Sequence, residues 1–438
     1  MKSLDLLAEA RLDPDIKFDH SLPKNAFSES WLQPQSILLT GVTGFVGAHL
    51  LVELIQKTKA TIYCLVRCDD FAAGTERIKA NLEHYLLWQE AFTTRIITIK
   101  GDLAKPHFDL SREQFEELSD RIDVIYHNGA WVNSFYPYAT LKAANVLATQ
   151  EILRLASYPK VKPIHFISTI GVFFSPYYFT DNLIDRAIKE TDLPTSETLK
   201  GGYKQSKWVA EQLILKAKEK GLPACIYRPG RIMGHSKTGI AGNLKDILYL
   251  AIKACIAMGK FPDIDTTLNI VPIDYVSQAI VYLSQQKASL AQQSQEHISF
   301  HLLNPQPIPW KKLIQEIQGF GYNLEETHYK TWVEELKKYA KARNDKELYS
   351  ISRLFFNSQI KLFARKPLFD IERIREGLAN TSISCPTIDR KLLSVYLSYW
   401  QKIGEIPESD RSPEPRQNFS RTFSSSPDIH TIDIHSEK

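Results

Sequence analysis

The feature that most constrains this chain is a short apolar run that leads directly into three glycines, each separated from the next by two residues. The run is Ile37–Thr40, and the glycines are Gly41, Gly44 and Gly47. This spacing predicts a tight turn at the first glycine, close backbone approach to a pyrophosphate at the second, and helix-to-strand contact at the third. The helix that follows presents unpaired N–H groups and the positive end of its dipole to an anion. The segment therefore predicts a dinucleotide site, with the phosphates expected against Gly41, Thr43, Gly44, Phe45, Val46 and Gly47.

Apolar runs typical of buried strands alternate with helical patterns from residue 36 to about residue 303. The runs are Ile37–Thr40, Thr61–Val66, Ile96–Lys100, Val124–His127, Lys162–Ser168 and Ala224–Tyr227. Parallel strands are buried on both faces and need crossover helices, so the alternation predicts an α/β fold with a doubly wound parallel sheet of the Rossmann type. In such a sheet, ligands bind at the carboxyl ends of the strands.

A chain of 438 residues exceeds one minimal core, so we expect more than one domain. The composition predicts an N-terminal leader or linker over 1–35, a dinucleotide-binding domain over 36–303, a smaller and mainly helical substrate domain over 304–404, and a disordered tail over 405–438. Polar insertions near 175–200 and 232–267 are expected on the substrate side. The tail is rich in serine, proline and charge, and has too few apolar residues to order itself.

Charge and cysteine content exclude several classes of protein. The net charge of +4, without a long basic stripe, argues against a nucleic-acid partner. No apolar run approaches the roughly 20 residues that a membrane span needs. The five cysteines are scattered and lack the spacing of a metal site, so we expect reduced thiols, no bound metal and a cytoplasmic protein.

Two arginines indicate which dinucleotide binds. Arg67 stands at the end of the second strand, where NAD-preferring folds place an acidic residue for the adenosine ribose. A guanidinium there fits a 2′-phosphate instead, and Arg77 in the following helix is placed to close on the same group. We therefore expect NADPH, with an ordinary solvated charge as the alternative for each arginine. After the third and fourth strands, the cofactor is expected to lie against Asp102, Leu103, Asn128, Gly129 and Ala130.

A second group of residues predicts proton transfer. Tyr203 and Lys207 are four residues apart at the start of an expected helix and therefore share a face, where both are also expected to contact the cofactor. A nearby ammonium favours the phenolate and lowers a phenol pKa that is ordinarily about 10, which suits Tyr203 as a general acid. The fifth strand ends in Ser168 and Thr169. Of these two, Thr169 is expected to hold and polarise a substrate carbonyl, and Ser168 to face the cofactor.

Three more residues are expected near the nicotinamide. Asn145 is expected to order a water or brace the lysine, with an ordinary polar helix position as the alternative. Pro229 and Gly230 form a rigid turn after the sixth strand, and its backbone is expected to bond the nicotinamide carboxamide.

These motifs resemble those of the extended short-chain dehydrogenase/reductases, which combine such a glycine motif with a Ser/Thr after the fifth strand and a Tyr-x-x-x-Lys sequence. Within that class the chain is most similar to the thioester reductase domains that terminate some nonribosomal peptide and polyketide assembly lines, and to those of carboxylic acid reductases and aminoadipate reductases. The segments that carry this likeness are Ile37–Gly47, Tyr63–Arg67, Tyr126–Ala130, Arg228–Gly230 and Val271–Tyr275, with Gly321, Tyr322 and Trp332 further on.

The resemblance implies NADPH-dependent reduction of an acyl thioester, carried by a carrier protein or by CoA, to an aldehyde, and with a second hydride to an alcohol. It implies that Tyr203 protonates the carbonyl oxygen, that Thr169 is hydrogen-bonded to that oxygen, and that Lys207 lowers the pKa of Tyr203 and holds the ribose. No adenylation or carrier domain is recognised in the sequence, so we expect an acyl or peptidyl carrier protein to present the substrate in trans. Between Lys330 and Arg375 there are 12 lysine and arginine residues against 6 aspartate and glutamate residues. We expect this stretch to dock an acidic carrier, with a solvated helical face as the alternative.

Two other functions stay open at this point. An extended dehydrogenase or epimerase acting on a small soluble carbonyl or a nucleotide sugar would turn over without any thioester. A non-catalytic NADP-binding scaffold is the third candidate, and the intact set of Thr169, Tyr203 and Lys207 argues against it.

Overall fold

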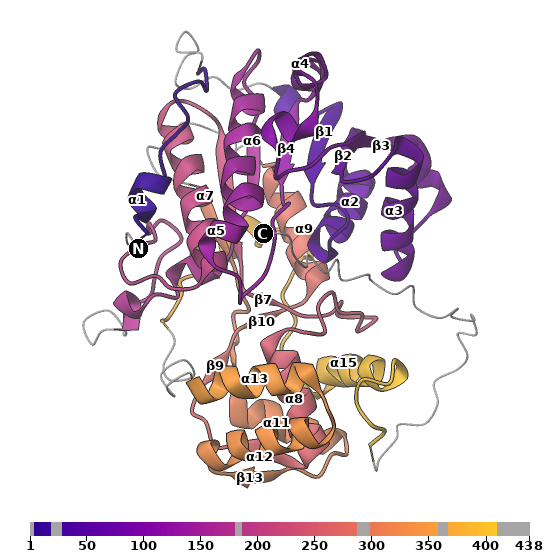
Figure 1. Ribbon diagram of the computed structural model, residues 1–438. Helices are drawn as coiled ribbons and strands as arrows, with labels where there is room; N and C mark the ends of the chain where they lie inside the picture. Colours follow the sequence, from indigo (N-terminus) through magenta and orange to yellow (C-terminus); the bar gives the residue numbers. More distant parts are fainter. Residues whose placement is uncertain (1–3, 19–28, 180–185, 287–297, 358–366, 410–438) are drawn as a thin grey trace, which may run out of the picture.

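Seven parallel strands form one central sheet in the part of the chain that the computed structural model describes, namely residues 4–18, 29–179, 186–286, 298–357 and 367–409. The strands are β1 (Ser36–Thr40), β2 (Thr61–Val66), β3 (Ile96–Lys100), β4 (Val124–His127), β5 (Ile164–Ile167), β6 (Ala224–Pro229) and β11 (Ser299–Leu302). Their order is β11-β6-β5-β4-β1-β2-β3, and every neighbouring pair is parallel. The doubly wound α/β fold expected from the sequence is confirmed (Figure 1).

The first six strands are those that the sequence predicts, with β5 shorter and β6 longer than expected. The seventh, β11, is not among the predicted strands. All four of its residues are buried, but Ser299 and His301 alternate with Phe300 and Leu302. The polar residues interrupt the apolar run that would indicate a buried strand.

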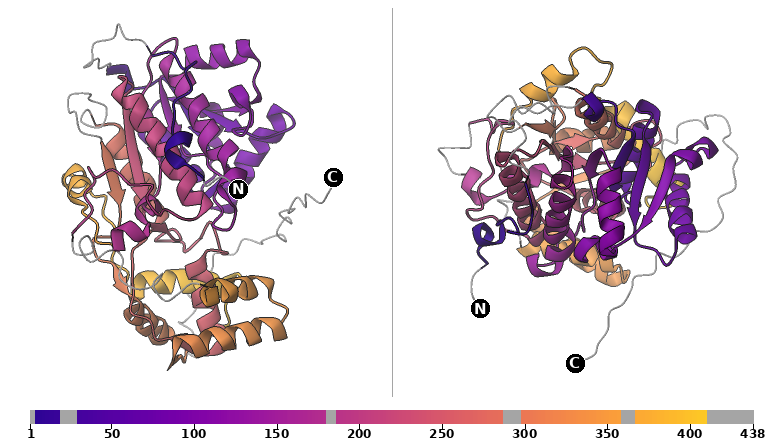
Figure 2. Two further views of the ribbon diagram at one scale, coloured as in Figure 1. Left: turned by 60° about the vertical axis from the view of Figure 1, so that its left-hand side comes forward. Right: turned by 90° about the horizontal axis from the view of Figure 1, so that it is seen from above.

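Helices cover both faces of the sheet, as the view from above in Figure 2 shows. One face carries α2 (Phe45–Lys57), α3 (Phe71–His84) and α9 (Ile273–Ser284), and the other carries α4 (Arg112–Arg121), α6 (Ala148–Ser157) and α7 (Gly202–Glu219). Successive side chains of a strand point to opposite faces. Accordingly, Ile37 and Leu39 belong to the apolar cluster under α2, whereas Leu38 belongs to the cluster under α7. The crossovers bring the carboxyl ends of all the strands to one edge.

The N-terminal segment is part of the core, which corrects the expectation that residues 1–35 form a leader outside it. The short helix α1 (Leu6–Glu9) and the residues after it place Leu6, Ala10 and Ile16 in the cluster under α7. Lys216 of α7 donates to the Ala10 carbonyl oxygen. Leu6 and Ala10 are four residues apart and therefore share one side of this turn. That side packs in the apolar cluster under α7.

A second body lies below the sheet in Figure 1 and has an apolar cluster of its own. Its elements are α8 (Ile247–Met258), α11 (Trp310–Phe320), α12 (Tyr329–Ala342), α13 (Lys346–Asn357), α15 (Arg390–Lys402), and the strand pairs β8 (Lys260–Pro262) with β13 (Glu325–Thr327) and β9 (Thr267–Leu268) with β12 (Ile308–Pro309). Between the two bodies, β7 (Arg231–Ile232) pairs with β10 (Ile270–Val271). The helix α14 (Glu372–Leu378) returns to the first body and packs against β11 and α9. The boundary expected at residue 303 therefore does not separate the two bodies, because α8 precedes it and belongs to the second body, whereas α14 follows it and packs on the first.

The first residues of the expected tail, 405–409, are held by contacts with the second body. Ile406 is buried in the second body, and the Glu405 carboxylate accepts hydrogen bonds from Lys253 (2.6 Å) and from the Tyr249 hydroxyl (2.9 Å). The disorder expected from residue 405 is therefore wrong for 405–409, because partners on α8 hold a segment whose own composition is polar. Residues 410–438 lie outside the described residues.

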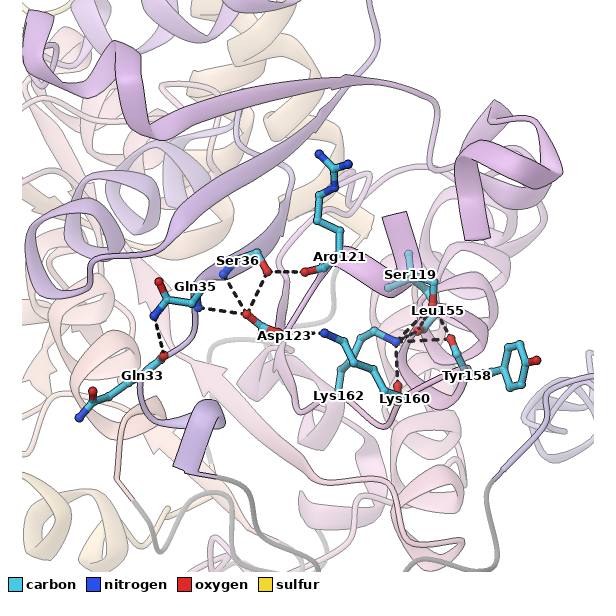
Figure 3. A network of polar contacts seen from close by, with 10 residues as sticks. All are labelled: Gln33, Gln35, Ser36, Ser119, Arg121, Asp123, Leu155, Tyr158, Lys160 and Lys162. Carbon is cyan, nitrogen blue, oxygen red and sulfur yellow. Dashed lines mark hydrogen bonds and ion pairs between the residues drawn. The ribbon is translucent and has the colours of Figure 1, made fainter. Parts of the chain in front are cut away.

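A polar network holds the amino ends of the strands, at the edge of the sheet opposite the glycine turn (Figure 3). Asp123, just before β4, accepts hydrogen bonds from the N–H (3.1 Å) and the hydroxyl (3.0 Å) of Ser36 and from Lys160 Nζ (3.0 Å). Lys162 is fully buried before β5, and its Nζ donates to the carbonyl oxygens of Leu155 (2.8 Å) and Lys160 (2.7 Å). Because the last carbonyl groups of a helix have no partner inside it, the Lys162 ammonium acts as a cap at the end of α6.

We expect Lys162→Met to lower the free energy of unfolding by about 1–3 kcal/mol, because the Lys160 carbonyl oxygen loses its side-chain donor and the Leu155 carbonyl oxygen keeps only the Ser119 hydroxyl. Lys160→Met is the matched control: its half-exposed ammonium reaches Asp123, and such pairs contribute at most about 1 kcal/mol. Urea titration followed by circular dichroism measures both variants. Equal losses in the two would contradict the capping role of Lys162.

Candidate active site

The three glycines between β1 and α2 have different reasons to be glycine. Gly41 has a φ of +74°, which favours a residue without a side chain. At Gly47 a Cβ would lie 2.0 Å from the Gly41 carbonyl oxygen, so glycine is needed for α2 to pack against the end of β1. At Gly44 a Cβ would meet that oxygen only at 3.4 Å, which is ordinary contact. Gly44 leaves bare backbone before a helix start that has no side-chain cap, and this arrangement fits a pyrophosphate.

The adenosine end of the expected site lies beyond β2 and β3. Arg77 Nη1 donates to the Arg67 carbonyl oxygen (2.7 Å), so the two arginines paired in the sequence analysis stand together. Both are exposed and, with Asp102, line an open cavity of about 1160 Å³. Asp102 Oδ1 accepts the Ala104 N–H (2.9 Å), which fixes this carboxylate at the end of β3. The lining of the cavity carries both signs of charge, with Arg67, Arg77, Lys100 and Arg121 against Asp69, Asp102, Asp109 and Glu117.

The remaining residues expected against the cofactor include six that are half-buried near the carboxyl ends of β1, β3 and β4, namely Thr43, Phe45, Val46, Leu103, Asn128 and Ala130. Gly129 is buried between two of these loops, since a Cβ there would lie 2.4 Å from Leu103 Cδ1. Asn128 Nδ2 donates to the Gly41 carbonyl oxygen (3.4 Å), which joins the loop after β4 to the glycine turn. The contacts of these residues with a cofactor stay predictions.

A buried chain of hydrogen bonds, which no local sequence pattern predicts, joins the glycine turn to the helix turn that carries Tyr203. The Gly129 N–H donates to Thr40 Oγ1 (2.8 Å), and the Thr40 hydroxyl is then free to donate to His127 Nδ1 (3.0 Å). His127 Nε2 donates in turn to Thr149 Oγ1 (3.1 Å), whose hydroxyl donates to the Asn145 carbonyl oxygen (2.8 Å). Burial lowers the pKa of His127 to about 3, so the ring is neutral, as this direction of the chain requires.

Asn145 lies in a single π-helical turn (Ala143–Leu147) between α5 (Tyr138–Lys142) and α6. Its Oδ1 accepts the Trp131 N–H (2.6 Å), and its Nδ2 donates to Ser206 Oγ (2.9 Å). Ser206 donates in turn to the carbonyl oxygen of Tyr203 (2.9 Å). Asn145 therefore braces the helix turn that carries Tyr203, and its expected role in ordering a water or bracing the lysine stays a prediction.

Thr169, Tyr203 and Lys207 come to the carboxyl end of β5. Tyr203 lies in the first turn of α7, and Lys207 follows one turn later. The buried Lys207 ammonium donates to the Ile167 carbonyl oxygen (2.6 Å) and lies over the Phe166 ring, 4.1 Å from its centroid. Thr169 follows Ile167 by two residues and is half-buried. The structure thus brings the three side chains predicted to be catalytic to one edge of the sheet, and their catalytic roles stay predictions.

Burial shifts the pKa values of Tyr203 and Lys207 at this edge. It raises the pKa of the Tyr203 phenol to about 12 and lowers the pKa of the Lys207 amine to about 7. Desolvation dominates both groups here, and the ammonium donates to a backbone carbonyl, so the expectation that Lys207 lowers the pKa of Tyr203 stays a prediction. A phenol that keeps its proton is still the form that a general acid needs.

Ser168 and Gly230, in the turn after β6, donate hydrogen bonds to other residues of the protein. Ser168 Oγ donates to the buried carboxylate of Glu211 (2.6 Å). The Gly230 N–H donates to the Leu302 carbonyl oxygen (3.0 Å), and Pro229 has no N–H. The expected cofactor contacts of these residues stay predictions, and those of Pro229 and Gly230 are limited to their carbonyl oxygens.

Two further kinds of site, for a metal and for a membrane, bear on the class of protein. Among the described residues, no group of three or more His, Cys, Asp or Glu side chains is arranged to hold a metal ion. No described helix combines the length and the apolar character that crossing a membrane requires.

A parallel sheet with an open glycine turn, an arginine-lined cavity and a Thr, Tyr and Lys edge defines a dinucleotide-binding oxidoreductase domain of the extended short-chain dehydrogenase/reductase class. The family described as male sterility protein matches residues 39–280, more than half of the chain, and the chain belongs to this family. It is an NAD(P)-binding domain, and its resemblance to terminal reductase domains is confirmed.

Individual relatives agree with this assignment. A linear gramicidin synthase polypeptide of Brevibacillus parabrevis is 39% identical over 401 residues, which are 91% of this chain and 8% of that protein. The terminal R domain from the myxalamid PKS-NRPS biosynthetic pathway has 40% sequence identity and a TM-score of 0.83, over 92% of this chain and 99% of that chain. A thiolation-reductase di-domain from an archaeal non-ribosomal peptide synthetase has 25% identity and a TM-score of 0.70, over 86% and 78% of the two chains. The chain thus spans a small part of the synthase and nearly all of a solved terminal reductase domain.

We expect Gly44→Ala to fold normally and to weaken NADPH binding by about tenfold or more, because its methyl group enters the space for the pyrophosphate. Gly47→Ala is the contrasting variant: its Cβ collides with the Gly41 carbonyl oxygen, so its melting temperature is expected to fall. Thermal unfolding and titration of NADPH fluorescence separate the two effects. A Gly44→Ala protein that binds NADPH as tightly as the wild type would contradict this placement of the phosphates.

Proposed function

We propose that this chain uses NADPH to reduce an acyl thioester, bound to a carrier protein or to CoA, to an aldehyde, and with a second hydride to the alcohol. The observation that carries the proposal is that Thr169, Tyr203 and Lys207 come to the carboxyl end of β5, at the edge that also holds the open glycine turn. The similarity to a terminal R domain over 99% of that domain supports it. The products belong to the biosynthesis of peptide, polyketide or fatty-acyl-derived metabolites.

In this reaction, NADPH supplies the hydride to the carbonyl carbon of the thioester. The Thr169 hydroxyl donates to the carbonyl oxygen and stabilises the negative charge that develops there. Tyr203 gives its phenolic proton to the same oxygen, which yields a hemithioacetal. The hemithioacetal then loses its C–S bond, its hydroxyl proton goes to the departing sulfur, and an aldehyde and a thiol remain. Lys207 holds the ribose and supplies positive charge beside Tyr203.

We expect Tyr203→Phe to lower kcat for thioester reduction by about 100-fold or more, because a positioned general acid is removed while the ring that fills the site remains. NADPH affinity, measured by fluorescence in the same protein, is the control and is expected to change by less than about twofold. Steady-state NADPH consumption with a panel of acyl thioesters measures the rate. A near-normal kcat would place the proton donor elsewhere.

The choice of NADPH over NADH is a separate proposal that depends on Arg67 and Arg77. Arg77 is held against the Arg67 carbonyl oxygen and both residues line one cavity at the end of β2, where a 2′-phosphate supplies the negative charge that complements two guanidinium groups. An exposed arginine is otherwise well solvated, so the pairing at this position favours a ligand role.

We expect Arg67→Ala to raise the KM for NADPH by about tenfold and to leave the KM for NADH nearly unchanged, because only the former carries the 2′-phosphate. Arg112→Ala, an exposed arginine on α4 outside the cavity, is the matched control. Initial rates at varied cofactor concentration give both constants. Equal changes in the two KM values would show that Arg67 does not bind the 2′-phosphate of NADPH.

A carrier protein that presents the thioester is the proposed partner. The archaeal thiolation-reductase di-domain joins such a partner to a similar fold, which supports the proposal. On α12, Lys338 and Lys341 are exposed and Lys337 is half-buried, within the basic stretch that the sequence analysis singled out. Part of that stretch, residues 358–366, lies outside the described residues.

We expect the triple variant Lys337→Glu, Lys338→Glu and Lys341→Glu to raise the KM for a carrier-bound acyl group by about tenfold, because it reverses the field that attracts an acidic carrier. The same acyl group on CoA is the control substrate, and its kinetics are expected to stay unchanged. An unchanged KM for the carrier-bound substrate would contradict the proposal that these lysines bind the carrier.

The proposed location is the cytoplasm. All five cysteines are free, which agrees with a reducing compartment.

A further inference from the structure

A buried ion pair lies one helical turn beyond Lys207, and the proposed reaction does not use it directly. Glu211 on α7 and Arg228 on β6 have fully buried side chains. Arg228 Nε donates to Glu211 Oε1 (3.0 Å), and Nη2 pairs with the same oxygen. Taking two charges out of water costs several kcal/mol per ion, so a pair of this kind needs further hydrogen bonds to hold it.

Those further bonds come from elements around the active edge. Ser168, which directly precedes Thr169, donates to Glu211 Oε2 (2.6 Å). Arg228 Nη1 donates to the Glu190 carbonyl oxygen (3.3 Å) and reaches His301 Nε2 on β11 (3.3 Å). Both carboxylate oxygens of Glu211 are thus engaged, and the group is fixed between α7, β5 and β6.

Lys207 needs a source of negative charge, because its own hydrogen bond goes to a neutral carbonyl group. Burial lowers the pKa of the Lys207 amine, and the Glu211 carboxylate opposes this effect. The neighbouring titratable groups give no such help: His127 on β4 is neutral, and the phenol of Tyr203, one turn earlier on α7, keeps its proton. Arg228 is positive and is paired with Glu211.

We infer that Glu211 is a positioning residue: its carboxylate, held by Arg228 and Ser168, keeps the Lys207 ammonium charged at the carboxyl end of β5. The contacts are independent of the reaction, and only the kinetic consequence rests on the proposed function. Without the carboxylate, the desolvation of Lys207 is unopposed, so the lysine loses its proton at a lower pH. It then loses its hold on the cofactor ribose and its charge beside Tyr203.

Three variants test the inference. Glu211→Gln keeps the size of the side chain and removes its charge. The double variant Glu211→Gln/Arg228→Met removes both charges, so it leaves no buried arginine unpaired. Glu219→Gln, on the exposed last turn of α7, is the matched control. NADPH affinity by fluorescence is measured from about pH 6 to about pH 9, together with kcat for an acyl thioester.

We expect the pH at which NADPH affinity and kcat fall to half to move down by about one unit in the single and the double variant, and to stay in place in Glu219→Gln. Unchanged midpoints in folded variants would overturn the inference. A shift in Glu211→Gln that the double variant reverses would also overturn it, because the unpaired arginine would then be the cause. If Glu211→Gln alone does not fold, the midpoint of the double variant decides. If the wild type binds NADPH but reduces no thioester, the proposed function fails, and the binding midpoints still decide this inference.

Discussion

The packing of α2 against the end of β1 is the constraint on which the rest of the site depends. No side chain fits at Gly47, where a Cβ would lie 2.0 Å from the Gly41 carbonyl oxygen, and this close contact fixes the helix start over the sheet edge. The loop after β4, which is a neighbour of β1 in the sheet, is positioned by the same region, since Thr40 at the end of β1 accepts the Gly129 N–H. From Thr40 the buried chain of hydrogen bonds continues to Asn145, which braces the helix turn of Tyr203. A backbone contact at the first strand therefore helps to set the position of the proton donor.

Burial of charge gives this edge its electrostatic character. Two buried cations, Lys207 and Arg228, and two buried carboxyl groups, Glu211 and Glu190, lie in this region. Arg228 pairs with Glu211, and burial raises the pKa of Glu190 to about 7. The Lys207 ammonium lies at the edge where a reduction places negative charge on a carbonyl oxygen. Because His127 is neutral and Tyr203 keeps its proton, the positive charge at this edge depends on the protonation of Lys207. The same desolvation that strengthens these charges also makes the lysine easy to deprotonate, and a fixed carboxylate one turn away counteracts that tendency.

The sequence predicts those parts of the fold and the site that depend on neighbours in the chain. The glycine turn, the six strands and the shared face of Tyr203 and Lys207 all follow from local spacing. By contrast, the polar residues of β11 interrupt the apolar pattern that would predict a strand, and the burial of α1 depends on contacts with α7. His127 and Glu211 acquire their roles from Thr40, Thr149, Ser168 and Arg228, which are distant in sequence, so no local pattern predicts these bonds. A carboxylate four residues after Lys207, on the apolar face of α7, is the one signal that would have singled out Glu211.

Hydride delivery to the carbonyl carbon of a thioester is the central claim, and isotope transfer tests it most directly. A single turnover with NADPH deuterated at C4 of the nicotinamide, on an acyl thioester, is followed by mass spectrometry of the product. The account predicts an aldehyde with one deuterium on the former thioester carbon and a free thiol. Free carboxylic acid with unconsumed NADPH, or an aldehyde without deuterium, would contradict it.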